Sequence, residues 1–311
     1  MSPKARRVAF GIGLPHYGRH ASPEAIARVA TEAERLGFDS LWVQDRLLLP
    51  TNPRDQYGGG PWPESHATVY DPIESLTYAA AKTRRIKLGT SVIDALFYVP
   101  VILARRFATL DQLSRGRVLA GLGQGWSRDE FETSNVSIKR RGRGFEEFVA
   151  ALRAVWGPDP VTFSGEFYRI PESRIGPKPV QPGGPPVILG AYARQAVERA
   201  ARIADGFMPV VGTWTKLESL RETIDLFRDA ARAAGRNPHE MHVVLRINAV
   251  ISEKPAKEPR ALLAGSVQQV ADDLSEFAEI GANHMFVDMN SFQVPVRTQL
   301  RLLRRLMSKL D

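Results

Sequence analysis

The chain has 311 residues, a formal net charge of +8 and no cysteine, with 43% hydrophobic and 24% charged residues. The absence of cysteine excludes disulfides, thiolate metal sites and cysteine nucleophiles. No apolar run approaches the ~20 residues that span a bilayer, and the basic residues are not gathered with aromatic residues as in nucleic-acid-binding proteins. We expect a globular, cytoplasmic protein that binds neither membranes nor nucleic acids.

Short apolar runs typical of buried strands alternate with segments whose apolar residues have helical spacing. The predicted strands are residues 8–14, 38–43, 86–93, 118–122, 187–189, 206–210, 242–250 and 284–289. The predicted helices that follow them are residues 24–36, 71–82, 100–113, 142–156, 193–203, 216–234, 266–280 and 296–310. The first helix has clear boundary signals, since Ser22 can cap its beginning, Pro23 suits its first turn and Gly37 can end it.

Eight strand-then-helix units in a chain of this length predict an α/β fold, a (β/α)8 TIM barrel in a single domain covering residues 1–311. Two segments interrupt the alternation and are predicted insertions, residues 48–70 after strand two and residues 157–186 before strand five. The glycine run at Gly121, Gly123 and Gly125 would also suit a dinucleotide-binding Rossmann fold. Against that alternative, the run lies in the fourth unit, and no acidic residue ends a strand ~20 residues later.

The first insertion is rich in glycine and proline and carries Tyr57, Trp62 and His66. Loops longer than about 12–15 residues without structure of their own are uncommon in compact domains unless they have a function. We interpret residues 48–70 as a lid over an active site, with disorder as the alternative.

In a barrel of this kind the active site lies where the strands end. The strand ends supply His16, Gln44, Asp45, Arg46, Ser91, Val92, Asp94, Gly123, Trp126, Gly190, Met208, Arg246 and Asp288. They contain no spaced set of metal ligands and no serine-nucleophile motif. His16, Asp45 and Arg46 are the titratable candidates for catalysis, although His16 could instead bond to the backbone and Asp45 with Arg46 could form a structural ion pair. The remaining residues suit an organic cofactor that supplies the chemistry itself.

Several segments, in this order, resemble the bacterial-luciferase-like flavin and deazaflavin oxidoreductases. They are GFDSLWVQDR (37–46), IKLGTSV (86–92), ATLDQLSRGRV (108–118), LGQGW (122–126), PKPVQPGGPPVILGA (177–191) and ERAARIADGFMP (198–209). The resemblance covers nearly the whole chain. It is closest to the actinobacterial subgroup described as dependent on the deazaflavin coenzyme F420.

The resemblance implies a barrel that holds a flavin-type ring at the strand ends, over a non-proline cis peptide at Ser91-Val92. It also implies that the cofactor phosphate lies at the turn Gly190-Ala191, because the N-terminus of a helix favours an anion. Family members commonly have a second glycine where this chain has Ala191. The other residues expected to bind the cofactor are Gln44, Asp45, Gly123, Gly125, Trp126 and Asp129.

One departure from the family concerns catalysis. Family members often end strand two with Asp-His, whereas this chain has Asp45-Arg46. Arg46 cannot release a proton near neutral pH, so we expect it to hold an anionic substrate or a ring carbonyl. His16 is then the expected proton donor or acceptor.

We therefore expect a homodimeric oxidoreductase that moves hydride between coenzyme F420 and a small organic substrate of apolar or ring-bearing character. The first alternative is a monooxygenase that uses reduced FMN and oxygen. The second alternative is a flavin- or deazaflavin-binding protein without turnover, which the missing histidine at Arg46 leaves open.

Overall fold

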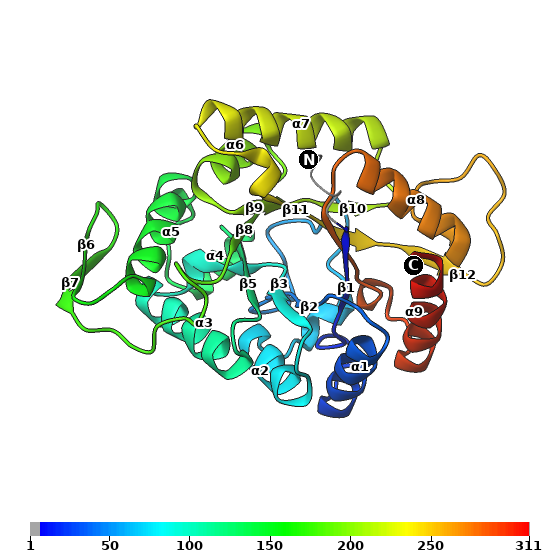
Figure 1. Cartoon of the computed structure of the whole chain (residues 1–311), viewed down its shortest axis with the longest axis horizontal. Coiled ribbons are helices and arrows are strands. Elements are labelled where there is room, and N and C mark those ends of the chain that lie inside the picture. Colours follow the sequence, from blue (N-terminus) through cyan, green and yellow to red (C-terminus); the bar gives the residue numbers. More distant parts are fainter. Residues whose placement is uncertain (1–6, 311) are drawn as a thin grey trace, which may run out of the picture.

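The computed structural model describes residues 7–310, which form a closed barrel of parallel strands surrounded by helices (Figure 1). The barrel strands, in order round the barrel, are β1 (Ala9–Gly13), β2 (Ser40–Val43), β3 (Lys87–Thr90), β5 (Val118–Gly123), β8 (Val187–Gly190), β9 (Gly206–Met208), β11 (His242–Asn248) and β14 (His284–Val287). Parallel pairing of β14 with β1 and of β9 with β11 closes the circle. The predicted (β/α)8 TIM barrel is confirmed.

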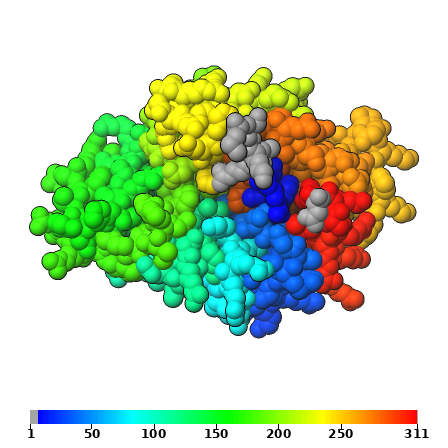
Figure 2. All heavy atoms as spheres, viewed as in Figure 1, coloured from blue at the N-terminus to red at the C-terminus, as the bar shows by residue number. Residues whose placement is uncertain are grey.

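Helices cover the outside of the barrel between successive strands. They are α1 (Pro23–Arg35), α2 (Pro72–Lys82), α3 (Pro100–Ser114), α5 (Arg143–Trp156), α6 (Arg194–Ile203), α7 (Leu217–Ala233), α8 (Val267–Glu279) and α9 (Val296–Leu310). Successive units follow one another round the molecule, so that α9 returns to contact α1 (Figure 2). As predicted, Ser22 caps α1, its side chain accepting a hydrogen bond from the Ala25 N–H. Between residues 7 and 310, no helix is both long and apolar enough to cross a membrane.

Some strands differ from the prediction. The sixth predicted strand is divided into β9 and β10 (Val210–Gly212) at Pro209, which has no N–H to donate. The seventh is divided into β11 and β12 (Val250–Ser252), and β12 pairs with β13 (Ala264–Ser266) outside the barrel. Short-range periodicity does not predict this pairing, because β13 has only three residues.

The two insertions contain little regular structure. In the first, between β2 and α2, one short 3-10 helix covers Glu64–Ala67. The second contains the antiparallel hairpin of β6 (Val161–Ser164) and β7 (Arg169–Ser173), which projects from the barrel beside α5 (Figure 1). Two further short elements follow barrel strands, β4 (Ile93–Asp94) after β3 and α4 (Arg128–Thr133) after β5. With six residues, α4 is too short for a helical period to reveal it in the sequence.

The interior of the barrel is a packed core. Side chains from six of the barrel strands fill it, namely Trp42, Leu119, Ile188, Met208, Val244 and Phe286. Trp42 stacks on Phe286 with ring centroids 4.6 Å apart. Because these side chains block the centre, the polar groups of the barrel are confined to its two ends.

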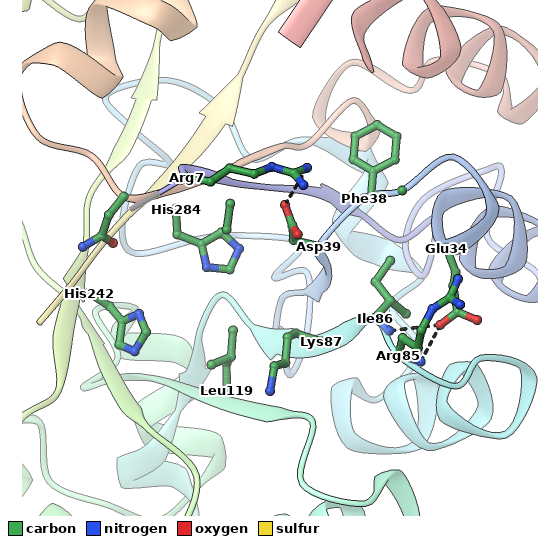
Figure 3. A pocket seen from close by; sticks show the side chains of 13 residues that line it. Arg7, Glu34, Phe38, Asp39, Arg85, Ile86, Lys87, Leu119, His242 and His284 are labelled. Atoms are coloured by element: carbon green, nitrogen blue, oxygen red, sulfur yellow. Dashed lines mark hydrogen bonds and ion pairs between the residues drawn. The ribbon is translucent and has the colours of Figure 1, made fainter. Parts of the chain in front are cut away.

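A cavity of about 430 Å³ lies at the N-terminal ends of the strands (Figure 3). Lys87, His242 and His284 line it. Beside it, the Glu34 carboxylate accepts hydrogen bonds from the backbone N–H groups of residues 84–86, which ties the beginning of β3 to the end of α1. In (β/α)8 enzymes this end of the barrel serves stability, whereas the opposite end carries the active site.

Candidate active site

A second cavity, of about 120 Å³, lies at the C-terminal ends of the strands, and we call it the strand-end cavity. Its lining residues are Gln44, Asp45, Arg46, Tyr57, Ser91, Val92, Asp94, Trp126, Gly190, Tyr192, Met208, Val210 and Arg246. Residues far apart in the sequence are thus brought together at the ends of six barrel strands and from the first insertion. The sequence prediction named seven of them as site residues, namely Gln44, Asp45, Arg46, Ser91, Val92, Trp126 and Gly190.

The peptide between Ser91 and Val92 is cis, as the resemblance implied, and both residues line the cavity. The neighbouring strand β2 and, from across the barrel, β11 hold this peptide. The Ser91 N–H donates to the Val43 carbonyl oxygen (2.6 Å), and Nη1 of Arg246 donates to the Ser91 carbonyl oxygen (2.9 Å). The Val92 carbonyl oxygen accepts from the Asp45 N–H (3.2 Å). The backbone at Ser91-Val92 is therefore a fixed part of the cavity wall.

The glycines of β5 make room for other protein groups. A Cβ at Gly123 would lie 2.6 Å from Cγ2 of Val92 and 2.7 Å from Oδ1 of Asp94. Gly125 has a φ of +73° and donates its N–H to the same Asp94 oxygen (3.1 Å). Both residues lie behind the cavity wall and position Asp94, so a cofactor would meet Asp94 and Val92 before it met these two glycines.

His16 does not line the strand-end cavity. Its ring is completely buried, Nδ1 donates to the Leu14 carbonyl oxygen (2.8 Å), and Nε2 accepts from the Gln44 N–H (2.9 Å). Burial also lowers the pKa of His16, so the ring is neutral with both nitrogens committed. The predicted role as proton donor is corrected accordingly, since His16 joins the end of β1 to the end of β2.

Arg46 is committed to a buried carboxylate. Its Nη1 lies 2.6 Å from Oε2 of Glu130, and the two side chains are 9% and 0% exposed. The other oxygen of Glu130 accepts from the Leu47 N–H (2.9 Å). The guanidinium also faces the rings of Trp62 and Trp126, at 5.1 and 5.5 Å. This geometry corrects the expectation that Arg46 is available for a substrate anion, because Glu130 already neutralises it.

Asp129 lies outside the cavity and fastens the first insertion. Its carboxylate accepts from the backbone N–H of Arg54 (3.0 Å) and from Nε of Arg54 (2.8 Å). Reciprocally, the Asp55 carboxylate accepts from the backbone N–H of Arg128 (2.7 Å) and from Nε of Arg128 (3.0 Å). We call these four residues the clasp. Asp129 was expected on the cofactor side, and the structure instead places it between the insertion and α4.

Aromatic side chains of the insertion extend the contact made by the clasp. Trp62 stacks on Trp126 with centroids 5.1 Å apart, and Tyr57 meets Trp126 edge-on at 5.9 Å. Tyr57 also lines the cavity. The insertion therefore covers the strand ends, in the position that the lid interpretation requires, and we refer to residues 48–70 as the lid.

Arg246, on β11, is the charged group buried beneath the cavity. Besides Ser91 it contacts Gln44, and its Nη2 donates to Oδ2 of Asp288 (2.8 Å). The same carboxylate oxygen accepts from the Tyr17 hydroxyl (3.1 Å). Nε of Arg246 is buried and finds no hydrogen-bond partner among residues 7–310. The sequence placed Arg246 and Asp288 at strand ends but gave no reason to select them, because their pairing joins residues 42 positions apart.

Two carboxyl groups of the cavity have raised pKa values. Burial raises the pKa of Asp45 to about 6 and that of Asp94 to about 7. Asp45 is in addition held by the Tyr98 hydroxyl, which donates to its Oδ2 (3.2 Å). Perturbed carboxyl groups that line a cavity are candidates for proton transfer. Asp94 is absent from the predicted site, although its position after strand three was a usable signal.

A sequence model of the luciferase-like monooxygenase family matches residues 8–261. The protein belongs to this family. The luciferase-like chain is 32% identical over 284 residues to an uncharacterized protein of Mycobacterium tuberculosis, across 90% of this chain and 91% of that one. It is 30% identical over 240 residues to the F420-dependent glucose-6-phosphate dehydrogenase of Amycolatopsis mediterranei, across 76% of this chain and 68% of that enzyme.

Solved structures agree with the fold. The luciferase-like barrel superposes on an F420-dependent secondary alcohol dehydrogenase in complex with an F420-acetone adduct, with a TM-score of 0.81. The superposition covers 98% of this chain and 99% of that one, at 20% sequence identity. The superposition confirms the fold, and the family assignment with the dehydrogenase relative confirms the expectation of a luciferase-like oxidoreductase and hence of an enzyme.

Proposed function

We propose that this protein transfers hydride between coenzyme F420 and a small organic substrate in the strand-end cavity. The observation that carries the proposal is the strand-end cavity itself, whose wall at Ser91 and Val92 is anchored by Arg246 from across the barrel. The 30% identity to an F420-dependent glucose-6-phosphate dehydrogenase supports the choice of cofactor.

The residues present suit a flat ring with a phosphate-bearing tail. Val92, Met208 and Val210 offer apolar contact inside the cavity. Gly190 leaves open a space in which a Cβ would lie 3.3 Å from Cγ1 of Val92. The helix α6 begins at Arg194, a few residues further on, and no side chain among residues 7–310 caps its N-terminus. Free N–H groups at a helix N-terminus bind phosphate, so Gly190, Ala191 and the first turn of α6 form the proposed phosphate site.

The cavity is too small to hold a cofactor unless the lid moves. Small-molecule sites commonly enclose about 300–1,000 Å³, whereas the strand-end cavity encloses about 120 Å³. Tyr57 of the lid and Trp126 occupy part of the remaining space. The proposal therefore includes an outward movement of the lid when the cofactor enters, followed by closure that excludes water.

The deazaflavin ring, when bound, supplies two-electron hydride chemistry. This chain's own residues position and enclose the reacting groups. Arg246 holds the Ser91 carbonyl oxygen and contributes a positive charge to the cavity lining, balanced by Asp288. Asp45 and Asp94 provide groups in the same cavity that can gain or lose a proton near neutral pH.

The charges of the cavity favour an uncharged substrate. Its two arginines, Arg46 and Arg246, are paired with Glu130 and Asp288. Neither is free to bind a substrate phosphate, so a sugar phosphate is disfavoured. Tyr57 and Trp62 of the lid suit an apolar or ring-bearing alcohol or carbonyl compound.

The alternative within the same family is a monooxygenase that uses reduced FMN and oxygen, which the family description itself supports. Titration of the purified protein with coenzyme F420 and, separately, with FMN, followed by ring fluorescence, distinguishes the two. We expect micromolar binding of F420. Micromolar binding of FMN without binding of F420 would transfer the proposal to the monooxygenase.

A binding protein without turnover predicts cofactor binding but no reduction of an artificial electron acceptor by the loaded protein. The homodimeric state is a proposal that rests on the family resemblance, and the cytoplasmic location is a proposal that rests on the sequence composition. Light scattering coupled to size-exclusion chromatography tests the former.

A further inference from the structure

Few groups in the strand-end cavity can exchange a proton near neutral pH. Arg46 and Arg246 are held in ion pairs with Glu130 and Asp288, and burial raises the pKa of Tyr192 to about 12. His16, the expected donor, lies outside the cavity with both ring nitrogens bonded. Asp45 and Asp94 are the carboxyl groups of the lining.

Asp94 is oriented by the backbone of β5. It pairs with Gly123 in the register between β4 and β5, and its Oδ1 accepts the Gly125 N–H (3.1 Å). The missing side chain of Gly123 gives this carboxyl its space, since a Cβ there would lie 2.7 Å from Oδ1. Among residues 7–310 the carboxyl has that one hydrogen bond. Asp94 lines the cavity, and 8% of the residue is exposed. One side of the group is fixed and its second oxygen remains available.

Asp45 differs in its hydrogen bonding. The Tyr98 hydroxyl donates to its Oδ2 (3.2 Å), and burial raises the pKa of Tyr98, so this donor keeps its proton. A hydrogen bond donated to a carboxylate stabilises its charged form. Asp94 also accepts one hydrogen bond, but burial raises the pKa of Asp45 only to about 6 and that of Asp94 to about 7, so Asp94 keeps its proton to the higher pH.

The surroundings of Asp94 keep both protonation states accessible. Burial raises its pKa to about 7, Arg46 at the end of β2 opposes the rise, and Asp45 and Glu130 add to it. The Gly125 N–H stabilises the charged form. A general acid or base works best when its pKa is near the working pH.

We propose that Asp94 is the catalytic residue that exchanges the substrate proton in the strand-end cavity. This inference rests on the proposed hydride transfer to or from a deazaflavin. When an alcohol is oxidised, its O–H proton passes to the Asp94 carboxylate, and its C–H hydrogen leaves with the bonding electron pair to the deazaflavin ring. The carbon–oxygen double bond forms from the O–H electron pair. In the reverse direction the Asp94 carboxylic acid protonates the oxygen as hydride reaches the carbonyl carbon.

The test compares Asp94→Asn with Asp45→Asn. Asparagine has nearly the same shape and its side-chain oxygen can still accept the Gly125 N–H, but it cannot exchange a proton at the working pH. Two measurements are made on each protein: the titration of 13C-labelled aspartate carboxyls by NMR without cofactor, and the pH profile of kcat with F420 and a panel of neutral alcohols that includes cyclohexanol. F420 affinity is measured by fluorescence alongside.

We expect the wild-type protein to show a carboxyl titrating near pH 7 that is missing in Asp94→Asn and retained in Asp45→Asn. We expect kcat of Asp94→Asn to fall about 10²–10⁴-fold, with F420 affinity changed less than about twofold. Wild-type carboxyls that all titrate below about pH 5, or an Asp94→Asn enzyme with wild-type kcat and pH profile, would overturn the inference. Failure of the wild-type protein to bind F420 would instead overturn the proposed function. The NMR titration needs no cofactor, so it would still show whether Asp94 holds a proton near pH 7.

Discussion

Nη1 of Arg246 donates a hydrogen bond of 2.9 Å to the carbonyl oxygen of Ser91, although the two residues are 155 positions apart. This bond links β11 to the cis peptide that follows β3 and crosses the floor of the strand-end cavity. Arg246 is also paired with Asp288 over 2.8 Å. A single side chain therefore joins the backbone of the cavity wall at Ser91 to the buried carboxylate of Asp288.

Replacement of Arg246 by methionine should destabilise the protein by about 3–5 kcal/mol, because removal of one partner leaves the other charge buried and unpaired. Urea denaturation followed by circular dichroism measures the change. The double variant Arg246→Met with Asp288→Leu is the matched control, and we expect it to recover part of the loss. A single variant as stable as the wild type would show that Asp288 finds another partner.

Replacement of Gly190 by aspartate should weaken F420 binding more than tenfold, which corresponds to over about 1.4 kcal/mol. The added carboxylate would lie where the proposed phosphate site needs neutral or positive groups. Gly190→Asn adds a side chain of the same size without the charge and separates crowding against Val92 from repulsion. Equal affinities of the two variants would place the phosphate elsewhere.

The clasp should control access to the strand-end cavity. Arg54→Glu places two carboxylates opposite each other and should increase hydrogen exchange and proteolytic cleavage across residues 48–63. Exposed ion pairs contribute only about 0.2–1 kcal/mol each, so global stability should change by at most about 1–2 kcal/mol. The exchanged pair Arg54→Glu with Asp129→Arg should restore protection. If the single variant is as protected as the wild type, the aromatic contacts of Tyr57 and Trp62 hold the lid without the clasp.

The raised pKa of Asp94 has a consequence for stability. A carboxyl whose pKa is higher in the folded than in the unfolded state binds more protons when folded, so its contribution to the free energy of unfolding falls as the pH rises. For Asp94 this window runs from about pH 4, the ordinary value of an aspartate, to about pH 7.

Asp94→Asn lacks this contribution. The free energy of unfolding of the variant minus that of the wild type should therefore increase as the pH is raised from 4 to 8. The expected increase is on the order of a few kcal/mol. Denaturation at both pH values measures the difference, in which the effects of all other carboxylates cancel. A difference that does not change with pH would contradict the raised pKa.

Much of the fold could be predicted because it depends on local signals. Ser22, Pro23 and Gly37 mark the first helix, and the apolar runs mark the barrel strands, so the alternation of eight units is written in consecutive residues. The breaks at Pro209 and after Asn248 were missed, because a strand's end depends on which neighbour it pairs with. The helix α4 was missed because it is shorter than two turns.

The residues of the candidate site likewise fall into a group that the sequence predicts and a group that it does not. Residues that directly end a strand, such as Gln44, Ser91 and Gly190, were placed in the cavity correctly from their positions. The partners of charged residues were not predictable: Arg46 faces Glu130, Asp129 faces Arg54, and His16 faces backbone atoms. Each of these contacts joins separate segments, and no spacing rule in the sequence encodes it.

The sequence by itself thus determined the barrel, the family resemblance and the strand ends at which chemistry is expected, because periodicity and chain order decide these. Only the tertiary structure decided which charges are neutralised and which remain available. Burial and hydrogen bonding are properties of the packed chain, and they removed His16 and Arg46 from the expected chemistry and left the carboxyl of Asp94 in the cavity with a pKa of about 7.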